Sequence, residues 1–200
     1  MMRYRMFYNF DAFGDTLLIL IHPEKKPDRV EDKNGVTALY LGDELLGYNI
    51  FDLSRVLKLK AKGIIFTPGV ELVTLVNQLL TAAGLPVLEE LTDSGFHVFK
   101  VTKIEEHPLD EKAKIVTLSD GKDTYETITK LNNVNVDDKV VGLIDGYIAP
   151  DGMMFLKHVD HNIKNDVLLL SEKALKQGED EKEIFKATKN EAGDDFFLGR

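Results

Sequence analysis

The sequence predicts an α+β protein, in which a mixed α/β N-terminal domain is followed by a small β-barrel. One amphipathic stretch, residues 69–84, has apolar side chains at spacings of three and four, as a helix packed on a core requires. After Gly95, short β-rich runs separated by turn residues replace this helical periodicity. Because the composition changes near residues 92–95, we expect two domains, residues 1–93 and 95–200.

In the first domain, four β-rich runs predict strands ahead of the helix. They lie at residues 4–10, 16–22, 36–41 and 46–51. Proline and glycine residues before Val70 and at Gly84 are typical of the two ends of a helix. The helix is expected to turn one apolar stripe toward the core, formed by Val73, Val76, Leu80 and Ala83.

The second domain is expected to be all-β, because its β-rich runs follow one another without intervening helices. These runs lie at residues 96–104, 114–118, 124–128, 139–144 and 153–159. Asp120-Gly121 predicts a tight hairpin, since this pair tolerates the positive φ of such turns. A small closed barrel or a sandwich would fit the pattern, and we favour a barrel with a charged C-terminal extension.

The composition is acidic, with 25 basic and 34 acidic residues and a formal net charge of −9. Nucleic-acid binding depends on Lys and Arg that neutralise phosphates, so a polyanion would have to bind a local basic patch. The absence of cysteine excludes disulfides, thiolate metal sites and cysteine nucleophiles. No apolar run approaches the ~20 residues of a membrane helix, and the N-terminus lacks a signal-peptide pattern. We therefore expect a soluble, cytoplasmic protein with no membrane partner.

Two motifs resemble ligand sites without meeting their requirements. His158 and His161, with Asp160 and Asp166 nearby, are metal-ligand types, but in a strand the two histidines would point to opposite faces. Residues 42–47 have the glycine spacing of a phosphate-binding loop but lack its lysine and hydroxyl, so a hairpin turn is expected. The dinucleotide fingerprint and the G-x-S-x-G nucleophile elbow are also missing. The sequence therefore predicts no metal, no cofactor and no enzymatic activity.

Arg55, Lys58, Lys60 and Lys62 form the most basic short stretch of the chain. The even spacing of the three lysines would place their ammonium groups on one face of a strand, where they could contact an anion or RNA. A solvated edge strand that lysines protect from pairing with other chains explains the same spacing. We favour the edge strand and keep the anion contact as the alternative.

Several short motifs occur in a fixed order along the chain. Residues 107–112 read HPLDEK, and LNNV and DDKVV follow at residues 131–134 and 137–141. This order resembles the bacterial tRNA-binding domain of the EMAP/Trbp type, whose motifs are H-P-x-A-D-x-L, A-x-N-V and G-x-x-V-V. The first half, through GDTLLI at residues 14–19 and GYNIF at residues 47–51, is similar to the N-terminal domain of YtpR-type proteins.

The resemblance implies that the second domain is an OB-fold-like β-barrel. It also implies a non-catalytic accessory protein that binds tRNA by shape and backbone, with no DNA partner. Family positions and the lysines of the expected barrel give the candidate RNA-binding residues Lys100, His107, Lys112, Lys122, Asn133, Lys157 and Ser171. Among them, His107 is expected to shape its loop, and Lys112 and Lys157 are the better candidates for phosphate contact.

The sequence also departs from the family motifs. Of the S-x-G-M-x-x-S segment, expected at residues 165–171, only Ser171 is retained, and Glu111 adds a carboxylate to the first loop. Acidic residues outnumber lysines between Phe96 and Asn165. These departures motivate an alternative, in which the barrel serves protein–protein interaction or homodimerisation and RNA binding has been lost.

Overall fold

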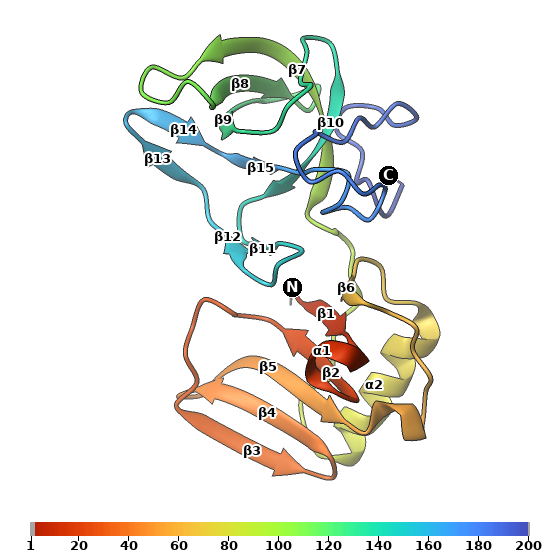
Figure 1. Cartoon of the computed structure of the whole chain (residues 1–200). Coiled ribbons are helices and arrows are strands. Elements are labelled where there is room, and N and C mark those ends of the chain that lie inside the picture. The colour runs from red at the N-terminus through yellow and green to blue at the C-terminus, as the bar shows by residue number, and fades with distance from the viewer. Residues whose placement is uncertain (1–2, 200) are drawn as a thin grey trace. The chain divides into compact units, whose positions relative to one another are not determined.

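The computed structural model describes residues 3–199, which divide into two compact units (Figure 1). Unit 1 consists of Met1–Leu91 and Ile148–Met154, and unit 2 of Thr92–Tyr147 and Phe155–Arg200. Within residues 3–199 the chain is mostly β, with fifteen strands and two α-helices. Helix is thus a smaller part of the molecule than the predicted α+β class implies.

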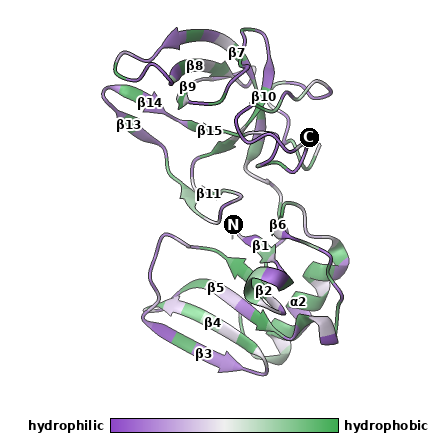
Figure 2. Ribbon diagram, viewed as in Figure 1, coloured by the Kyte–Doolittle hydropathy of each residue, from purple (hydrophilic) through white to green (hydrophobic). Residues whose placement is uncertain are grey.

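Unit 1 is built on a six-stranded antiparallel sheet with the strand order β3-β4-β5-β2-β1-β6. Its strands are β1 (Arg5–Tyr8), β2 (Thr16–Leu20), β3 (Arg29–Lys33), β4 (Val36–Leu41), β5 (Glu44–Phe51) and β6 (Gly63–Ile65). The predicted strands correspond to β1, β2, β4 and β5. The sequence analysis missed β3, a charged and largely exposed edge strand that is mostly purple in Figure 2. The turn predicted from residues 42–47 joins β4 to β5.

Two α-helices accompany this sheet: the short α1 (Phe10–Phe13) and the longer α2 (Val70–Ala82). The predicted amphipathic helix is confirmed as α2, which buries Leu72, Val76 and Leu80 in a core shared with residues of the sheet. Apolar residues four apart lie on one face of a helix, which explains why this element could be predicted from a local pattern.

The basic stretch contains no strand. Its first residue, Arg55, ends a single 3₁₀ turn, η1 (Leu53–Arg55), and no strand pairing is formed until β6 begins at Gly63. The predicted edge strand at Lys58–Lys62 was therefore wrong, although the alternation that suggested it is real: Leu57, Leu59 and Ala61 are partly buried and the lysines are exposed.

Unit 2 contains a five-stranded antiparallel sheet with the order β15-β10-β7-β8-β9. Its strands are β7 (Phe96–Glu106), β8 (Lys114–Ser119), β9 (Thr124–Thr129), β10 (Lys139–Ile144) and β15 (Val167–Leu169). Two short hairpins connect β10 to β15; they are formed by β11 (Tyr147–Ile148) with β12 (Met154–Phe155), and by β13 (His158–Asp160) with β14 (Ile163–Asn165). Within the first hairpin, Ile148–Met154 belong to unit 1. The single strand predicted at residues 153–159 is thus divided between β12 and β13.

The sheet of unit 2 curls into a nearly closed barrel, because β9 returns to the segment that leads into β15. The N–H of Asp166 donates to the carbonyl of Glu126 at 2.9 Å. The hydroxyl of Thr127 contacts both the Asn165 side chain and the Val167 carbonyl. Phe99, Val101, Val116, Leu118, Val140 and Val167 fill the interior. The predicted barrel and the Asp120-Gly121 hairpin between β8 and β9 agree with this arrangement.

Residues 171–199 form an irregular C-terminal extension, which the backbone ties to the barrel. The N–H of Ala187 donates to the carbonyl of Lys139 at 2.8 Å, at the start of β10. At the start of β7, the N–H of Val98 donates to the carbonyl of Asp194 at 2.9 Å. β8 pairs with β7 only from Lys100 onward. The extension thus occupies the earlier part of β7, which β8 leaves unpaired.

No helix within residues 3–199 combines the length and the apolar character that a membrane crossing requires.

Candidate nucleic-acid interface

The outward face of β8 and β9 is mostly uncharged. Val116, Leu118 and Thr127 point into the barrel, so the alternate positions of both strands point outward. Three outward cross-strand pairs result: Ile115 with Ile128, Thr117 with Glu126, and Ser119 with Thr124. The one carboxylate of this set, that of Glu126, accepts the N–H of Lys164 at 2.8 Å.

The aromatic side chains of β7 and β9 are directed away from this face. Phe99 is buried, and its ring meets that of Tyr125 edge-on with centroids 5.2 Å apart. The hydroxyl of Tyr125 donates to Asp120 at 2.8 Å. Burial and this hydrogen bond raise the pKa of Tyr125 to about 12. The three strands therefore offer hydrogen bonds and apolar contact but no exposed ring on which a base could stack.

The loop between β7 and β8, residues 107–113, lies at one end of the face. The Nδ1 atom of His107 accepts the N–H of Leu109 at 3.3 Å, so this histidine shapes the loop. Asp110 accepts the N–H of Lys112 at 3.0 Å and forms an ion pair with Lys130 at 2.7 Å. The Lys130 hydrogen bond keeps the pKa of Asp110 below its ordinary value. The ammonium group of Lys112 is exposed and has no ion-pair partner within residues 3–199.

Lys122, Lys157 and Lys164 lie around the other end of the face, where β9 begins. Lys122 belongs to the hairpin turn between β8 and β9. Lys157 borders a hollow of about 450 Å³ that is also lined by Asp123, Asp145 and Asp166. All three lysines are exposed without ion-pair partners in the described part of the chain. The lysines near the start of β9 thus share their surroundings with carboxylates, which weaken the local attraction for an anion.

The remaining predicted residues are engaged with other parts of unit 2. Lys100 pairs with Asp137 at 2.8 Å on the outside of β7. The side-chain amide of Asn133 donates to Glu183 at 3.3 Å, which connects the β9–β10 loop to the C-terminal extension. Ser171 is only 7% exposed, and its hydroxyl accepts the N–H of Ala174.

The structure therefore separates the predicted residues into two kinds. Lys112 and Lys122 are free cations beyond opposite ends of β8, a strand about 17 Å long. Lys157, like Lys122, lies near the start of β9. Cations at both ends of an uncharged face can contact phosphates along a nucleic-acid backbone, since such contacts need no base recognition. Lys114 and Lys164, at the same two ends, were not among the predicted residues.

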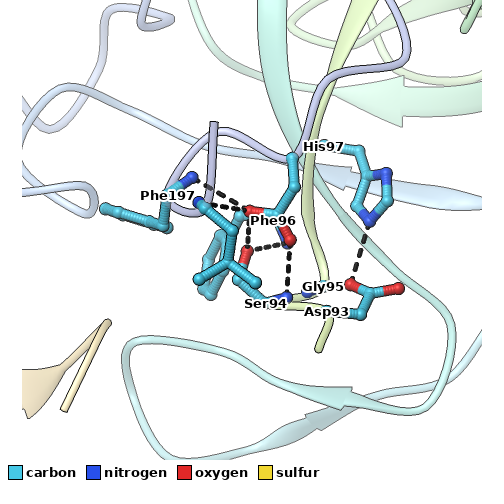
Figure 3. A network of polar contacts seen from close by, with 8 residues as sticks. Asp93, Ser94, Gly95, Phe96, His97 and Phe197 are labelled. Carbon is cyan, nitrogen blue, oxygen red and sulfur yellow. Dashed lines mark hydrogen bonds and ion pairs between the residues drawn. The ribbon is translucent and has the colours of Figure 1, made fainter. Parts of the chain in front are cut away.

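A second polar group, which the sequence analysis did not identify, joins the C-terminal extension to the start of β7 (Figure 3). The Asp195 carboxylate is 5% exposed. It accepts the N–H and the hydroxyl of Ser94, each at 2.6 Å, and the N–H groups of Phe197 and Leu198 at 3.0 and 2.9 Å. Ser94 and Asp195 are 101 residues apart, so no local pattern could have indicated this contact.

His97 and Asp93 pair with each other (Figure 3), and both lie close to Asp195. The Nε2 atom of His97 is 3.0 Å from Asp93 Oδ1, and this hydrogen bond raises the pKa of His97 above its ordinary value. Burial disfavours the charged Asp93, but the contacts with His97 and the Gly95 N–H outweigh it and lower the Asp93 pKa to about 2. The three side chains are of metal-ligand type, with ligand atoms within 4.8 Å of one another. Their hydrogen bonds already engage these atoms, so the group is best described as an anchor.

The histidines considered as metal ligands lie on the β13–β14 hairpin. His158 is on β13, where its Nε2 atom is 3.3 Å from the side-chain amide of Asn165. His161 is in the following turn, and its Nε2 atom is 3.6 Å from Asp160.

Comparisons with known proteins agree with the resemblance drawn from the sequence. A family described as "Domain of unknown function (DUF4479)" matches residues 23–92, all of which except Thr92 lie in unit 1. The "Putative tRNA-binding protein YtpR" of Bacillus subtilis (strain 168) is 27% identical over 174 residues, covering 84% of this chain and 86% of that protein. The similarity to YtpR-type proteins is thereby confirmed.

Proposed function

We propose, from the resemblance to YtpR-type proteins, that this protein is a non-catalytic accessory factor that binds tRNA through unit 2. The similar Bacillus protein carries a tRNA-binding name, and the similarity spans both units of this chain. Binding is proposed to depend on the shape and backbone of tRNA, because the outer face of β8 and β9 offers no exposed aromatic ring.

The topology of unit 2 supports an OB-fold. An OB-fold is a partly open five-stranded barrel that binds oligonucleotides on its second and third strands and on the loops after strands 1 and 4. With β7 as the first strand, these elements are β8, β9, residues 107–113 and residues 145–166, of which Ile148–Met154 belong to unit 1. The free lysines described above occur in these loops and at the ends of these strands.

The observation that carries the proposal is the exposure of Lys112 and Lys157, one on each of the two loops, without an ion-pair partner in the described residues. A free ammonium group can neutralise a phosphate without first breaking an ion pair. The carboxylates of Asp123, Asp145 and Asp166 beside Lys157 oppose such binding. We therefore expect weak binding, with a dissociation constant of about 10⁻⁵ M at physiological salt and a strong salt dependence.

Titration of labelled bulk tRNA with the full chain at about 50 mM salt tests the proposal. The double variant Lys112→Gln, Lys157→Gln should bind about tenfold more weakly, and its salt dependence should be flatter by about 1.5 in log–log slope. The control is Lys103→Gln, Lys173→Gln, which removes the same charge from two ion-paired lysines of unit 2. Absence of saturable binding, or an equal loss in both variants, would refute the proposal.

A second candidate, self-association through unit 2, is favoured by apolar side chains on the same loops. Leu109 is 69% exposed, Leu156 52% and Val159 65%. Light scattering over a range of concentrations distinguishes this candidate: a dimer that Leu109→Ser, Val159→Ser dissociates would support it, and a monomeric mass would exclude it.

A further inference from the structure

Unit 1 carries a row of exposed lysines that the proposed function of unit 2 leaves unexplained. The row consists of Lys58, Lys60 and Lys62, between η1 and β6. It lies inside the region matched by the DUF4479 family.

Both ends of this segment are fixed to the rest of unit 1. Before the row, Leu53 is fully buried, and the Asp15 carboxylate accepts the N–H and the hydroxyl of Ser54 at 3.0 and 2.6 Å. After the row, β6 pairs with β1, so that Gly63 lies opposite Tyr8. The segment is therefore held at both ends by contacts with the rest of unit 1.

The inner side of the segment determines where the lysines point. Leu57, Leu59 and Ala61 pack against the core of unit 1. Lys58, Lys60 and Lys62 alternate with these partly buried residues and are exposed, so all three point outward. Successive lysines are at most about 7 Å apart along the chain.

The row is short of acidic partners. Within residues 3–199, Lys58 and Lys60 have neither an ion-pair nor a hydrogen-bond partner, in side chain or backbone. The ammonium group of Lys62 is 3.6 Å from Asp11 in a pair whose side chains are 80% and 78% exposed. Such an exposed pair contributes little energy and yields readily to another anion. The segment thus presents free ammonium groups together with unpaired backbone N–H groups.

We propose that the Lys58–Lys60–Lys62 row is a second RNA-binding surface, which contacts the phosphate backbone of RNA. A polyanion matches a regular line of cations held on a fixed segment, and phosphate contact needs no base recognition. This inference rests on the proposed function, because its ligand is the same RNA that unit 2 is proposed to bind. The surface itself is separate and lies on unit 1.

Lysines near a sheet edge can also serve only to prevent association with other strands, and β6 is an edge strand. The two roles differ in their consequences. Edge protection requires positive charge but no phosphate contact, so its loss causes aggregation without changing how RNA binding depends on salt.

The test measures binding of labelled bulk tRNA to the full chain between about 50 and 200 mM salt. The variant Lys58→Gln, Lys60→Gln, Lys62→Gln is compared with Lys25→Gln, Lys26→Gln, Lys33→Gln, which removes the same charge elsewhere in unit 1. Glutamine keeps most of each stem, and equal urea midpoints would show that the fold is retained. We expect the row variant to bind about tenfold more weakly, with a log–log salt slope flatter by about 2, and the control to change less than about twofold.

The outcomes separate this inference from the function proposed for unit 2. If the Lys112, Lys157 variant loses affinity while the row variant does not, the inference is overturned and the proposed function stands. The opposite result supports the row and rejects the unit 2 site. If the full chain binds no tRNA, the proposed function fails, and the same variants are tested with single-stranded poly(U); binding that does not depend on the row then overturns the inference. Aggregation of the row variant with an unchanged salt slope would also overturn it.

Discussion

In unit 1, Lys58 and Lys60 extend from a fixed segment without acidic partners, whereas many lysines of unit 2 are held by carboxylates. On the outside of the barrel, Lys100 pairs with Asp137 and Lys103 with Glu105, both at 2.8 Å. Lys139 of β10 pairs with Glu191 of the C-terminal extension, and Lys186 of the extension pairs with Asp138. In unit 2, several lysines are therefore engaged in ion pairs, and the unpaired Lys112, Lys122 and Lys157 lie in loops and turns.

This difference shows why net charge is a poor guide to where a polyanion can bind. The chain carries a net charge of −9, yet unit 1 presents a row of exposed lysines in which Lys58 and Lys60 have no acidic partner among the described residues. The availability of an ammonium group depends on its nearest carboxylates, because an ion pair must be broken before a phosphate can replace its acidic partner. The comparison can be tested by changing the charges on the unit 2 side.

The largest expected effect concerns the charges that stabilise unit 2. Asp195→Ala should lower the free energy of unfolding by about 3 kcal/mol, because it leaves the buried donors of Ser94 and the half-buried N–H groups of Phe197 and Leu198 without this acceptor. Urea denaturation measures this change. Asp43→Asn, which alters an exposed carboxylate of unit 1, is the control and should change stability by less than about 0.5 kcal/mol. Equal stabilities would mean that the anchor contributes nothing to unit 2.

A smaller effect is expected when a barrel lysine is released from its partner. Asp137→Asn should free Lys100 and strengthen tRNA binding by about two- to fivefold, since an exposed ion pair is worth about 0.2–1 kcal/mol. Asparagine also tolerates the positive φ of 71° at this position, so the turn should be retained. The measurement is again tRNA titration, with Asp43→Asn as the control for overall charge. Unchanged affinity would show that pairing does not limit the use of Lys100.

The smallest expected effect is the pH dependence of the anchor. Because the pKa of His97 is raised in the folded state, its pairing with Asp93 stabilises the fold below the ordinary histidine pKa, and this contribution is lost as the pH rises through the raised value. Urea unfolding at acidic and at alkaline pH should show this loss, which His97→Gln should abolish. The same pH dependence in His97→Gln would assign it to another group. Asp93, whose pKa is lowered to about 2, should stay charged throughout this range.

The sequence predicted the elements whose signals are local. The helix α2 follows from apolar residues spaced along one face, and the β8–β9 hairpin from Asp120-Gly121 between alternating residues. The strand β3 was missed because four of its five residues, RVEDK, are charged, and both of its faces are largely exposed. The strand β15 has only three residues and is defined by its pairing with β10, which lies far away in sequence.

The candidate site was predictable to a similar extent. Lys112 and Lys157 could be named from their motifs, but whether a lysine is free or paired depends on contacts that folding creates. Lys100 meets Asp137 and Asn133 meets Glu183 only in the folded barrel. In unit 1, the lysine spacing was recognised, but the absence of a neighbouring strand was not, because strand pairing is decided by the fold around the segment.

Lysine footprinting tests most directly the claim that unpaired cations contact the RNA. The full chain is acetylated with and without bulk tRNA, and the modification of each lysine is quantified by mass spectrometry. The account expects tRNA to protect Lys58, Lys60, Lys112 and Lys157, and to leave the ion-paired Lys103 and Lys139 unchanged. Protection of the paired lysines, with the free ones still fully modified, would contradict it.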